Sequence, residues 1–328
     1  MIPEFFTPRH EWLDHVGRIY QLLHSVHLSE ETNSQRVELR RRNRIHSVHS
    51  STAIEGNRLS LDEVTAVIDG HVVFSPEKDV QEVRNAWAAY EALESFDPFS
   101  VDDFLRAHGL LTQGLISESG CFRSRDVDIV NAAGDVLHTG SQVDKVPRLI
   151  TELFEWASTT TAHPLVASSA THFLIEHIHP FQDGNGRIGR LWQTLMLSQW
   201  DPLFIWLPTE TLIAHHQQDY YEALQASREP EIDAAPFITF MLGVIEDTLA
   251  DYQTHVGINV GINVGINDAV LALIREDPHL SAGHMAERLG VSSRQVERAI
   301  KMWRDSGVLF RVGSRKTGYW EVSQGRPV

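Results

Sequence analysis

Residues 179–190 read His-Pro-Phe-Gln-Asp-Gly-Asn-Gly-Arg-Ile-Gly-Arg, and this stretch decides how the rest of the chain is interpreted. Apolar residues at helical spacing precede it, among them Val166 and Phe173, and a second apolar helix follows through Leu191 and Leu195. The glycine-rich segment is therefore expected to be a loop between two helices that opens into the N-terminus of the second.

The residues around this helix start have the composition of a polyphosphate site. The amides of Gly184, Asn185 and Gly186 are predicted to receive phosphate groups. Glycine adopts positive φ without penalty, and a helix N-terminus supplies unpaired N–H donors. Arg187 and Arg190 are three residues apart, so both side chains lie on one side of the helix and can bind one polyphosphate.

Asp183 and His179 add a metal ligand and a base to this loop. The Asp183 carboxylate is a hard oxygen ligand of the kind that Mg²⁺ prefers. His179 lies four residues earlier and can take a proton near neutral pH. Phe181 is expected to be buried and to anchor the loop. Together the base, the metal ligand, the phosphate-binding amides and the two arginines predict phosphoryl or nucleotidyl transfer, which depends mainly on positioning and charge neutralisation.

Position by position, residues 179–190 resemble the signature of the Fic family, whose protein adenylyltransferases transfer AMP from ATP to a Ser, Thr or Tyr hydroxyl of a protein or of themselves. The resemblance implies that His179 is the general base and that Asp183 holds Mg²⁺. It implies that residues 184–186 receive the phosphates and that Arg187 and Arg190 contact the β- and γ-phosphates. Kinases of the superfamily carry lysine in place of the second signature glycine, so the glycine here favours AMP transfer.

Residues 51–57, Ser-Thr-Ala-Ile-Glu-Gly-Asn, resemble the inhibitory helix of the same family. That motif reads Ser or Thr, three residues, Glu, then Gly or Asn, and is met here by Ser51, Glu55 and Gly56. The resemblance implies that Glu55 pairs with Arg190 and occupies the guanidinium that should receive the γ-phosphate. A helix end near Glu55 that carries no inhibitory role is the alternative interpretation.

The expected fold is mainly α: a Fic-type helical core with a small β-hairpin flap, followed by a winged-helix α+β domain. Residues 1–100 are predicted to be an N-terminal helical region that carries the inhibitory helix, and residues 101–255 the catalytic core. Residues 256–267 are three copies of Val-Gly-Ile-Asn and are expected to be an extended linker, because glycine and β-branched residues disfavour helix. Residues 268–328 form the last domain.

Shorter patterns fill in this outline. Residues 60–63, Ser-Leu-Asp-Glu, form a capping box, which predicts a helix that starts near Leu61. Residues 127–138 predict a hairpin. The hairpin resembles the family's flap, which aligns target segments by strand addition, and its His138 stands where relatives often carry proline.

Tyr220 and Tyr221 resemble a pair that lines the adenine pocket in relatives, and a buried aromatic pair is the open alternative.

The last 61 residues have the pattern of a winged helix. Helices are expected at 268–275, at 281–289 and from Ser292 or Ser293 to about Asp305, with a hairpin over residues 308–322. Basic residues follow the third helix and the wing: Arg294, Arg298, Lys301, Arg304, Arg311, Arg315 and Lys316. DNA and protein both stay open as partners of this domain.

Charge and cysteine content limit the function classes. The formal net charge is −16, of which residues 268–328 carry +3 and the rest −19, so the whole chain is not expected to bind nucleic acid or an anionic membrane. Cys121 is the only cysteine, which fits a reducing compartment. With no signal-peptide pattern and no apolar run near ~18 residues, we expect a cytoplasmic protein. Relatives with this motif are often homodimers, and the sequence leaves the oligomeric state open.

Three alternatives remain. A zinc hydrolase would use the histidines and carboxylates of residues 172–183 as ligands, but it leaves Gly-Asn-Gly-Arg unexplained. A DNA-binding regulator would use the Fic unit in a secondary role. The same site could also remove AMP from a modified protein, with Glu55 positioning a water molecule, and the sequence does not separate the two directions.

Overall fold

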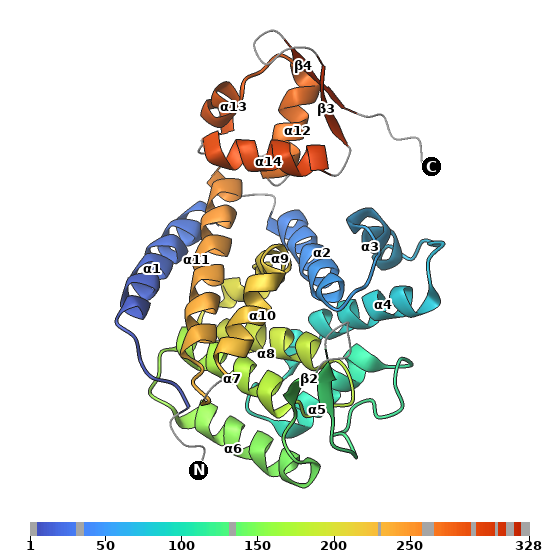
Figure 1. The fold of residues 1–328 in the computed structure, drawn as a ribbon, viewed down its shortest axis with the longest axis vertical. Coiled ribbons are helices and arrows are strands. Elements are labelled where there is room, and N and C mark those ends of the chain that lie inside the picture. Colours follow the sequence, from blue (N-terminus) through green and yellow to red (C-terminus); the bar gives the residue numbers. More distant parts are fainter. Residues whose placement is uncertain are drawn as a thin grey trace. The chain divides into compact units, whose positions relative to one another are not determined.

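Two helices that pack against each other form the centre of the fold (Figure 1). They are α7 (Pro164–Ile178) and α8 (Asn185–Trp200). Most residues of both helices are buried, so each helix is enclosed on all sides, as expected where other helices surround it. The loop that joins them, residues 179–184, is the glycine-rich segment of the sequence, so the predicted helix–loop–helix is confirmed.

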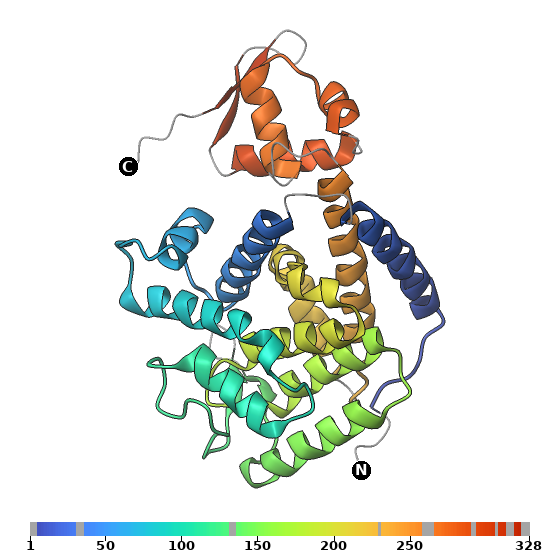
Figure 2. The ribbon, with the colours of Figure 1, turned by 180° about the vertical axis from the view of Figure 1, so that it is seen from behind.

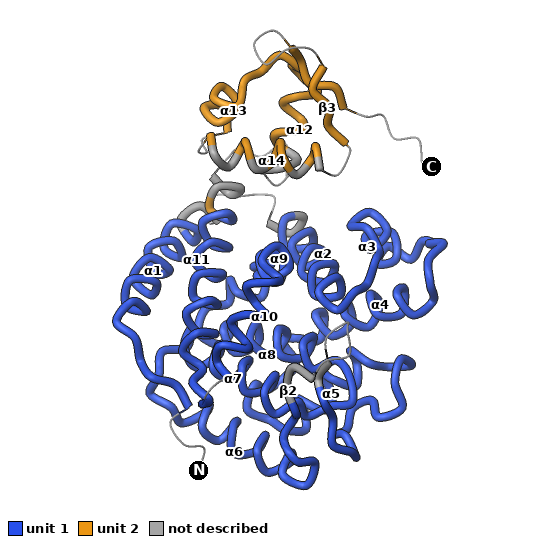
Figure 3. The backbone as a smooth tube through the Cα atoms, in the orientation of Figure 1, with its two compact units in different colours: residues 1–252 blue, residues 253–328 orange. Residues whose placement is uncertain are grey.

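The structure, a computed structural model, describes residues 5–30, 36–130, 136–228, 231–257, 266–289, 293–305, 308–312 and 318–322. The chain divides into two compact units, residues 1–252 and residues 253–328 (Figure 3). The N-terminal helices and residues 101–252 both belong to the first unit. No helix among the described residues is long and apolar enough to cross a membrane.

The other elements of the first unit surround the central pair, as the view from behind also shows (Figure 2). They are α1 (Glu11–Glu30), α2 (Arg36–Ile54), α3 (Leu61–Ile68), α4 (Glu77–Glu91), η1 (Leu93–Ser95), α5 (Val101–Thr112), β1 (Asp128–Val130), β2 (Val136–Thr139), η2 (Val143–Lys145), α6 (Val146–Thr159), η3 (Pro202–Trp206), α9 (Thr209–His215), α10 (Gln217–Ala226) and α11 (Ala235–Gly257). The mainly helical fold that the sequence predicts is confirmed.

An aromatic cluster fixes α8 against its neighbours. The Trp192 ring lies 5.0 Å from the Phe104 ring of α5 and 5.8 Å from the Phe154 ring of α6, measured between centroids. Its indole N–H donates to the Pro98 carbonyl at 3.0 Å. Because all three rings are buried, this cluster contributes the large apolar burial that sets the direction of α8.

The chain leaves α2 and enters α3 where the sequence predicts. Helix α2 ends at Ile54, and Gly56 follows with a left-handed φ of 92°. The capping box is complete, because Ser60 accepts from the Glu63 amide and Glu63 accepts from the Ser60 amide. These ends place Glu55 in a short turn just beyond α2.

The predicted hairpin consists of β1 and β2, which pair antiparallel. Asp128 pairs with Thr139 and Ile129 with His138, and the register shifts before Val130 pairs with Val136. Residues 131–135 of the predicted turn and the side chain of His138 lie outside the described residues.

The second unit has the elements expected of a winged helix: α12 (Ile266–Glu276), α13 (Ala282–Leu289), α14 (Ser293–Asp305), β3 (Leu309–Val312) and β4 (Tyr319–Val322). It has its own apolar core, to which Val270, Met285 and Ile300 belong. Lys301, Arg304 and Arg311 are exposed, whereas the side chains of Arg294, Arg298, Arg315 and Lys316 lie outside the described residues.

The expected extended linker is wrong at both of its described ends. Helix α11 continues to Gly257, and α12 already begins at Ile266. Residues 258–265 between them lie outside the described residues. Helix propagation from a stable neighbouring helix outweighs the low helix propensity of Val, Ile and Gly at these ends.

Candidate active site

His179 ends α7 with a strained backbone. Its N–H donates to the Ile175 carbonyl at 2.9 Å, and its own φ of 53° and ψ of 63° lie in the left-handed region. Among the described residues, no other non-glycine residue has a positive φ. Such a conformation costs about 1–3 kcal/mol and is often found at functional sites. The loop therefore holds His179 in a conformation that local preference alone would not give.

Phe181 anchors the loop, as predicted, and is fully buried. Its ring stacks on the His108 ring, with centroids 3.6 Å apart and planes 6° apart. Asn185 braces the same residue from α8, because its side-chain oxygen accepts from the Phe181 N–H at 2.9 Å and its amide donates to the Phe181 carbonyl at 3.0 Å. The Asn185 side chain is thus used within the loop, and its backbone N–H belongs to the first turn of α8.

Gly184 and Gly186 place no side chain over the first turn of α8. Gly184 caps the helix with a left-handed φ of 85°, and its residue type provides no side-chain cap for the first-turn amides. A Cβ atom on Gly186 would meet the Glu55 carboxylate and lie 3.0 Å from Arg190 Nη1. Of Gly184, Asn185 and Gly186, only Gly184 has a left-handed backbone. The amides predicted to receive phosphate therefore belong to a helix N-terminus that follows one left-handed residue.

Arg190 is buried and paired with Glu55. Glu55 Oε1 accepts from Arg190 Nη2 at 2.7 Å, and the Ser51 carbonyl and hydroxyl accept from Nη2 and Nε at 3.0 and 3.2 Å. Burial lowers the pKa of Arg190, but Glu55, Tyr220 and Glu176 together outweigh burial, so the pKa is raised. The structure therefore brings together Ser51, Glu55 and Arg190 from segments about 140 residues apart in the chain. Arg190 Nη1 is buried and makes no hydrogen bond within the described part of the chain.

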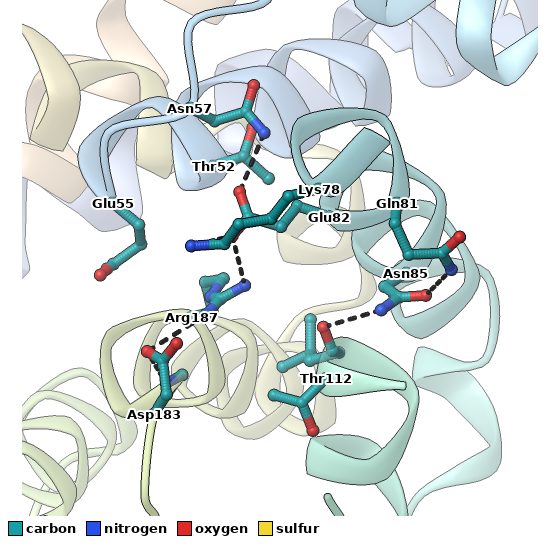
Figure 4. Close-up of polar contacts among 12 residues, drawn as sticks. Thr52, Glu55, Asn57, Lys78, Gln81, Glu82, Asn85, Thr112, Asp183 and Arg187 are labelled. Carbon is teal, nitrogen blue, oxygen red and sulfur yellow. Dashed lines mark hydrogen bonds and ion pairs between the residues drawn. The ribbon is translucent and has the colours of Figure 1, made fainter. Parts of the chain in front are cut away.

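Arg187 faces two carboxylates (Figure 4). Its Nη2 lies 3.4 Å from Asp183 Oδ1, and its Nη1 lies 3.6 Å from Oε1 of Glu82, a buried residue of α4. Asn57, two residues after Glu55, donates to Glu82 Oε2 at 2.9 Å. The turn that carries Glu55 is thus linked to Arg187 through Asn57 and Glu82. Sequence reasoning missed Glu82, because a single glutamate in an amphipathic helix has the pattern of a surface residue.

His108 positions Asp183 from behind. Its Nδ1 accepts from the Gly120 N–H at 3.2 Å, so the ring proton is on Nε2, which donates to the Asp183 carbonyl at 2.9 Å. Burial lowers the pKa of His108 to about 4, which keeps this neutral form at physiological pH. The Asp183 side chain is half exposed at the mouth of the site. Nothing in the sequence around His108 indicates this role.

Tyr220 and Tyr221 have different environments. Tyr220 is 1% exposed, and its hydroxyl lies 3.3 Å from Glu176 Oε1 and 3.2 Å from His172 Nε2. Burial lowers the pKa of His172 to about 3 and raises the pKa of Glu176. Tyr221 is 44% exposed. Of the two tyrosines proposed for the adenine pocket, Tyr221 has surface to offer a ligand, and Tyr220 lies in an enclosed polar cluster.

The ligands of the zinc alternative are not gathered. Among the described residues, which include all of 172–183, no group of three or more His, Cys, Asp or Glu could hold a metal ion. His172 is fully buried, and its Nδ1 lies 2.7 Å from Gln193 Oε1. Buried His172 therefore supports the fold, and Asp183 is the carboxylate that the loop presents to solvent.

Comparisons with known proteins point to one family. Residues 98–197 match the sequence model described as "Fic/DOC family". "Protein adenylyltransferase Fic" of Nematostella vectensis is 25% identical over 217 residues, which are 62% of this chain and 48% of that protein. "Protein adenylyltransferase fic-1" of Caenorhabditis elegans is 28% identical over 225 residues, 64% of this chain and 41% of that protein. The chain thus spans less than half the length of these two curated relatives.

A solved structure resembles the whole chain. The crystal structure of a Fic family protein from Desulfovibrio desulfuricans G20 is 36% identical, has a TM-score of 0.72 and covers 100% of both chains. A Fic-1 structure from Caenorhabditis elegans is 25% identical, with a TM-score of 0.56 and 72% of each chain covered.

Proposed function

The chain belongs to the Fic family, and from that premise we propose that it is a protein adenylyltransferase restrained by its own Glu55. AMP would pass from ATP to a hydroxyl of a protein or of the chain itself. The names of the curated relatives support AMP transfer as the activity.

One contact carries the proposal of restraint: Glu55 Oε1 lies 2.7 Å from Arg190 Nη2. Arg190 is the second arginine at the N-terminal end of α8, where unpaired amides and two buried guanidinium groups favour a triphosphate. While Glu55 holds Arg190, a γ-phosphate finds that donor occupied and meets a negative charge. ATP would then bind without its α-phosphate correctly aligned.

The proposed chemistry uses His179 as general base. The imidazole takes the proton of the acceptor hydroxyl, and the hydroxyl oxygen forms a bond to the α-phosphorus of ATP. The bond between the α-phosphorus and the oxygen that bridges to the β-phosphorus breaks, and pyrophosphate leaves. Arg187 and Arg190 hold the β- and γ-phosphates, and the first-turn amides of α8 support the same charge.

Asp183 is the residue that would hold Mg²⁺. The fit is reasonable because its half-exposed carboxylate stands at the mouth of the site beside the amides that would receive phosphate. A single carboxylate suits an ion that is otherwise held by water and substrate phosphates. When bound, Mg²⁺ neutralises charge that develops on the phosphates. Gly186 further favours AMP transfer, because it stands where kinases of the superfamily carry lysine.

Labelling with ATP that carries its label on the α-phosphate tests the proposal. Glu55→Gly should label itself, and proteins of a lysate, well above wild type, and Glu55→Gly with His179→Ala should lose ~10²–10⁴ in rate while it still binds ATP. Wild-type-like rates in the double variant would remove His179 from the mechanism. Label that transfers from the γ-phosphate instead would make the protein a kinase.

Removal of AMP by the same site is the second candidate. It is favoured by the exposure of Glu55, whose carboxylate is 28% exposed and binds Arg190 through Oε1, so that Oε2 is able to hold a water molecule. If wild type strips AMP from protein that Glu55→Gly has labelled, and Glu55→Gly does not, removal is the physiological direction.

A further inference from the structure

Arg123 is a buried arginine between the flap and the catalytic loop. Its side chain is 1% exposed, although it stands in an irregular segment that precedes β1. It forms an ion pair with the Asp126 carboxylate at 3.7 Å, and the Asp126 side chain is 68% exposed. A buried guanidinium without a close buried counter-ion is costly, so its hydrogen bonds must offset the lost hydration.

The guanidinium donates to three backbone carbonyls. Nε donates to the His179 carbonyl at 2.7 Å, Nη1 donates to the Arg125 carbonyl at 2.6 Å, and Nη2 donates to the Ser141 carbonyl. In addition, the Arg123 N–H donates to the Pro180 carbonyl at 3.0 Å. Arginine is the one side chain that offers a rigid planar set of donors for several fixed acceptors at once.

These carbonyls belong to the two ends of the flap and to the base. Arg125 precedes β1, Ser141 follows β2, and His179 is the residue with the left-handed backbone. The Ser141 N–H also donates to the Ile178 carbonyl at 3.2 Å, so the end of β2 is bound to the end of α7. One side chain therefore joins both ends of the hairpin to the residue that carries the imidazole.

Gly140 packs closely against Arg123 and His179 at this junction. A Cβ atom on Gly140 would lie 3.1 Å from Arg123 Nη2 and 3.4 Å from the Cβ of His179. The Gly140 N–H donates to the Val127 carbonyl at 3.0 Å, which holds the two ends of the hairpin together. A shift of the flap would thus be transmitted through Arg123 to His179.

We propose that Arg123 is a positioning residue that sets the His179 imidazole relative to the flap, so that a hydroxyl aligned on the flap meets the base. This inference rests on the proposed AMP transfer. Because the Arg123 side chain is enclosed, it acts through the backbone of His179 and not by contact with ATP or the acceptor. The expected signature is a loss of rate at unchanged ATP affinity, since the phosphates would bind at the start of α8.

The test compares Arg123→Lys with its parent Glu55→Gly, in self-labelling with α-labelled ATP and with rates counted per ATP-binding site. Lysine keeps the charge but presents a point charge in place of the fork, so kcat should fall at least about tenfold while KM for ATP changes less than about twofold. Arg106→Lys is the matched control. Arg106 donates to the Ser95 carbonyl at 2.9 Å on an exposed surface, and its replacement should leave kcat unchanged.

Two further variants keep the inference open to refutation. Gly140→Ala crowds Arg123 and His179 without removing a charge and should lower kcat severalfold, even if Arg123→Lys does not fold. In a His179→Ala background, Arg123→Lys should cost less than about twofold, because a residue that acts through the base has nothing left to position. Equal losses in both backgrounds, or an unchanged kcat in folded Arg123→Lys and Gly140→Ala, would overturn it. If the Glu55→Gly parent transfers no AMP, the proposed function fails and this inference falls with it.

Discussion

Replacing Glu55 by glutamine isolates the charge of the proposed inhibitor from its size. Two unit charges about 4 Å apart attract by roughly 4 kcal/mol at an effective dielectric constant of 20. Glu55 is 28% exposed, so solvent reduces this value, and Arg190 keeps its bonds to Ser51 when the carboxylate is gone. A net change of about 1–2 kcal/mol remains, which is ~5- to 30-fold in kcat/KM for ATP.

Glu55→Gly should go further, because it also removes the side chain that lies against Gly186. The expected order of kcat/KM in labelling with α-labelled ATP is wild type, then Glu55→Gln, then Glu55→Gly. Arg190→Ala in the Glu55→Gly background should cancel the gain, since the released guanidinium is the group that receives the phosphate. Equal rates for wild type and both Glu55 variants, or a gain that survives Arg190→Ala, would refute the reasoning.

Four more outcomes are expected. Asp183→Ala should lose both activity and Mg²⁺ dependence, and labelling that persists in EDTA would contradict the role of Asp183. Glu82→Gln keeps an acceptor for Asn57 but removes the charge that faces Arg187, so kcat in the Glu55→Gly background should fall about fivefold; a rise would make Glu82 a second competitor for Arg187. Burial lowers the pKa of His172 to about 3 and of His108 to about 4, below roughly 6.5 for unfolded histidine. Their contribution to stability is therefore complete above about pH 6.5 and is lost towards pH 4, by roughly 1.4 kcal/mol per histidine and pH unit. A urea midpoint that stays constant between about pH 7 and 5 would contradict this contribution. Through residues 268–328 the protein should bind duplex DNA weakly at low salt, and Arg294→Ala with Arg298→Ala should weaken that binding; no complex at low salt would leave protein as the partner of this unit.

The sequence was informative where the contacts are local. The capping box, the loop between two apolar helices and the buried Phe181 each depend on residues within a few positions of one another, and each is confirmed. The three helices and the hairpin that the structure describes in the second unit also follow from local turns and apolar spacing. The prediction of an extended linker over residues 256–267 was wrong at the described ends, because helix propensity is a weak preference beside the packing of the adjoining helices.

The rest of the site depends on pairs that are distant in the chain. His108 and Asp183 are 75 residues apart, and Arg123 and His179 are 56 apart. Neither side chain belongs to a local motif, and each acts on a backbone carbonyl, which every residue type has. The pairing of Glu55 with Arg190 is equally distant, and only a family resemblance made it predictable.

The way α2 is held limits how Glu55 can be released. Ser47 of this helix donates to the buried carboxylate of Glu210 on α9 at 2.8 Å, and Gln217 of α10 donates to the Ile54 carbonyl at its last turn, also at 2.8 Å. Moving α2 away would break both bonds and take the Ser47 donor from the buried Glu210 carboxylate, and each buried polar group that loses its partner costs about 1–3 kcal/mol. Glu55 is the first residue beyond the helix. Its side chain can therefore leave Arg190 by rotation within that turn, while the helix that carries it stays part of the catalytic core.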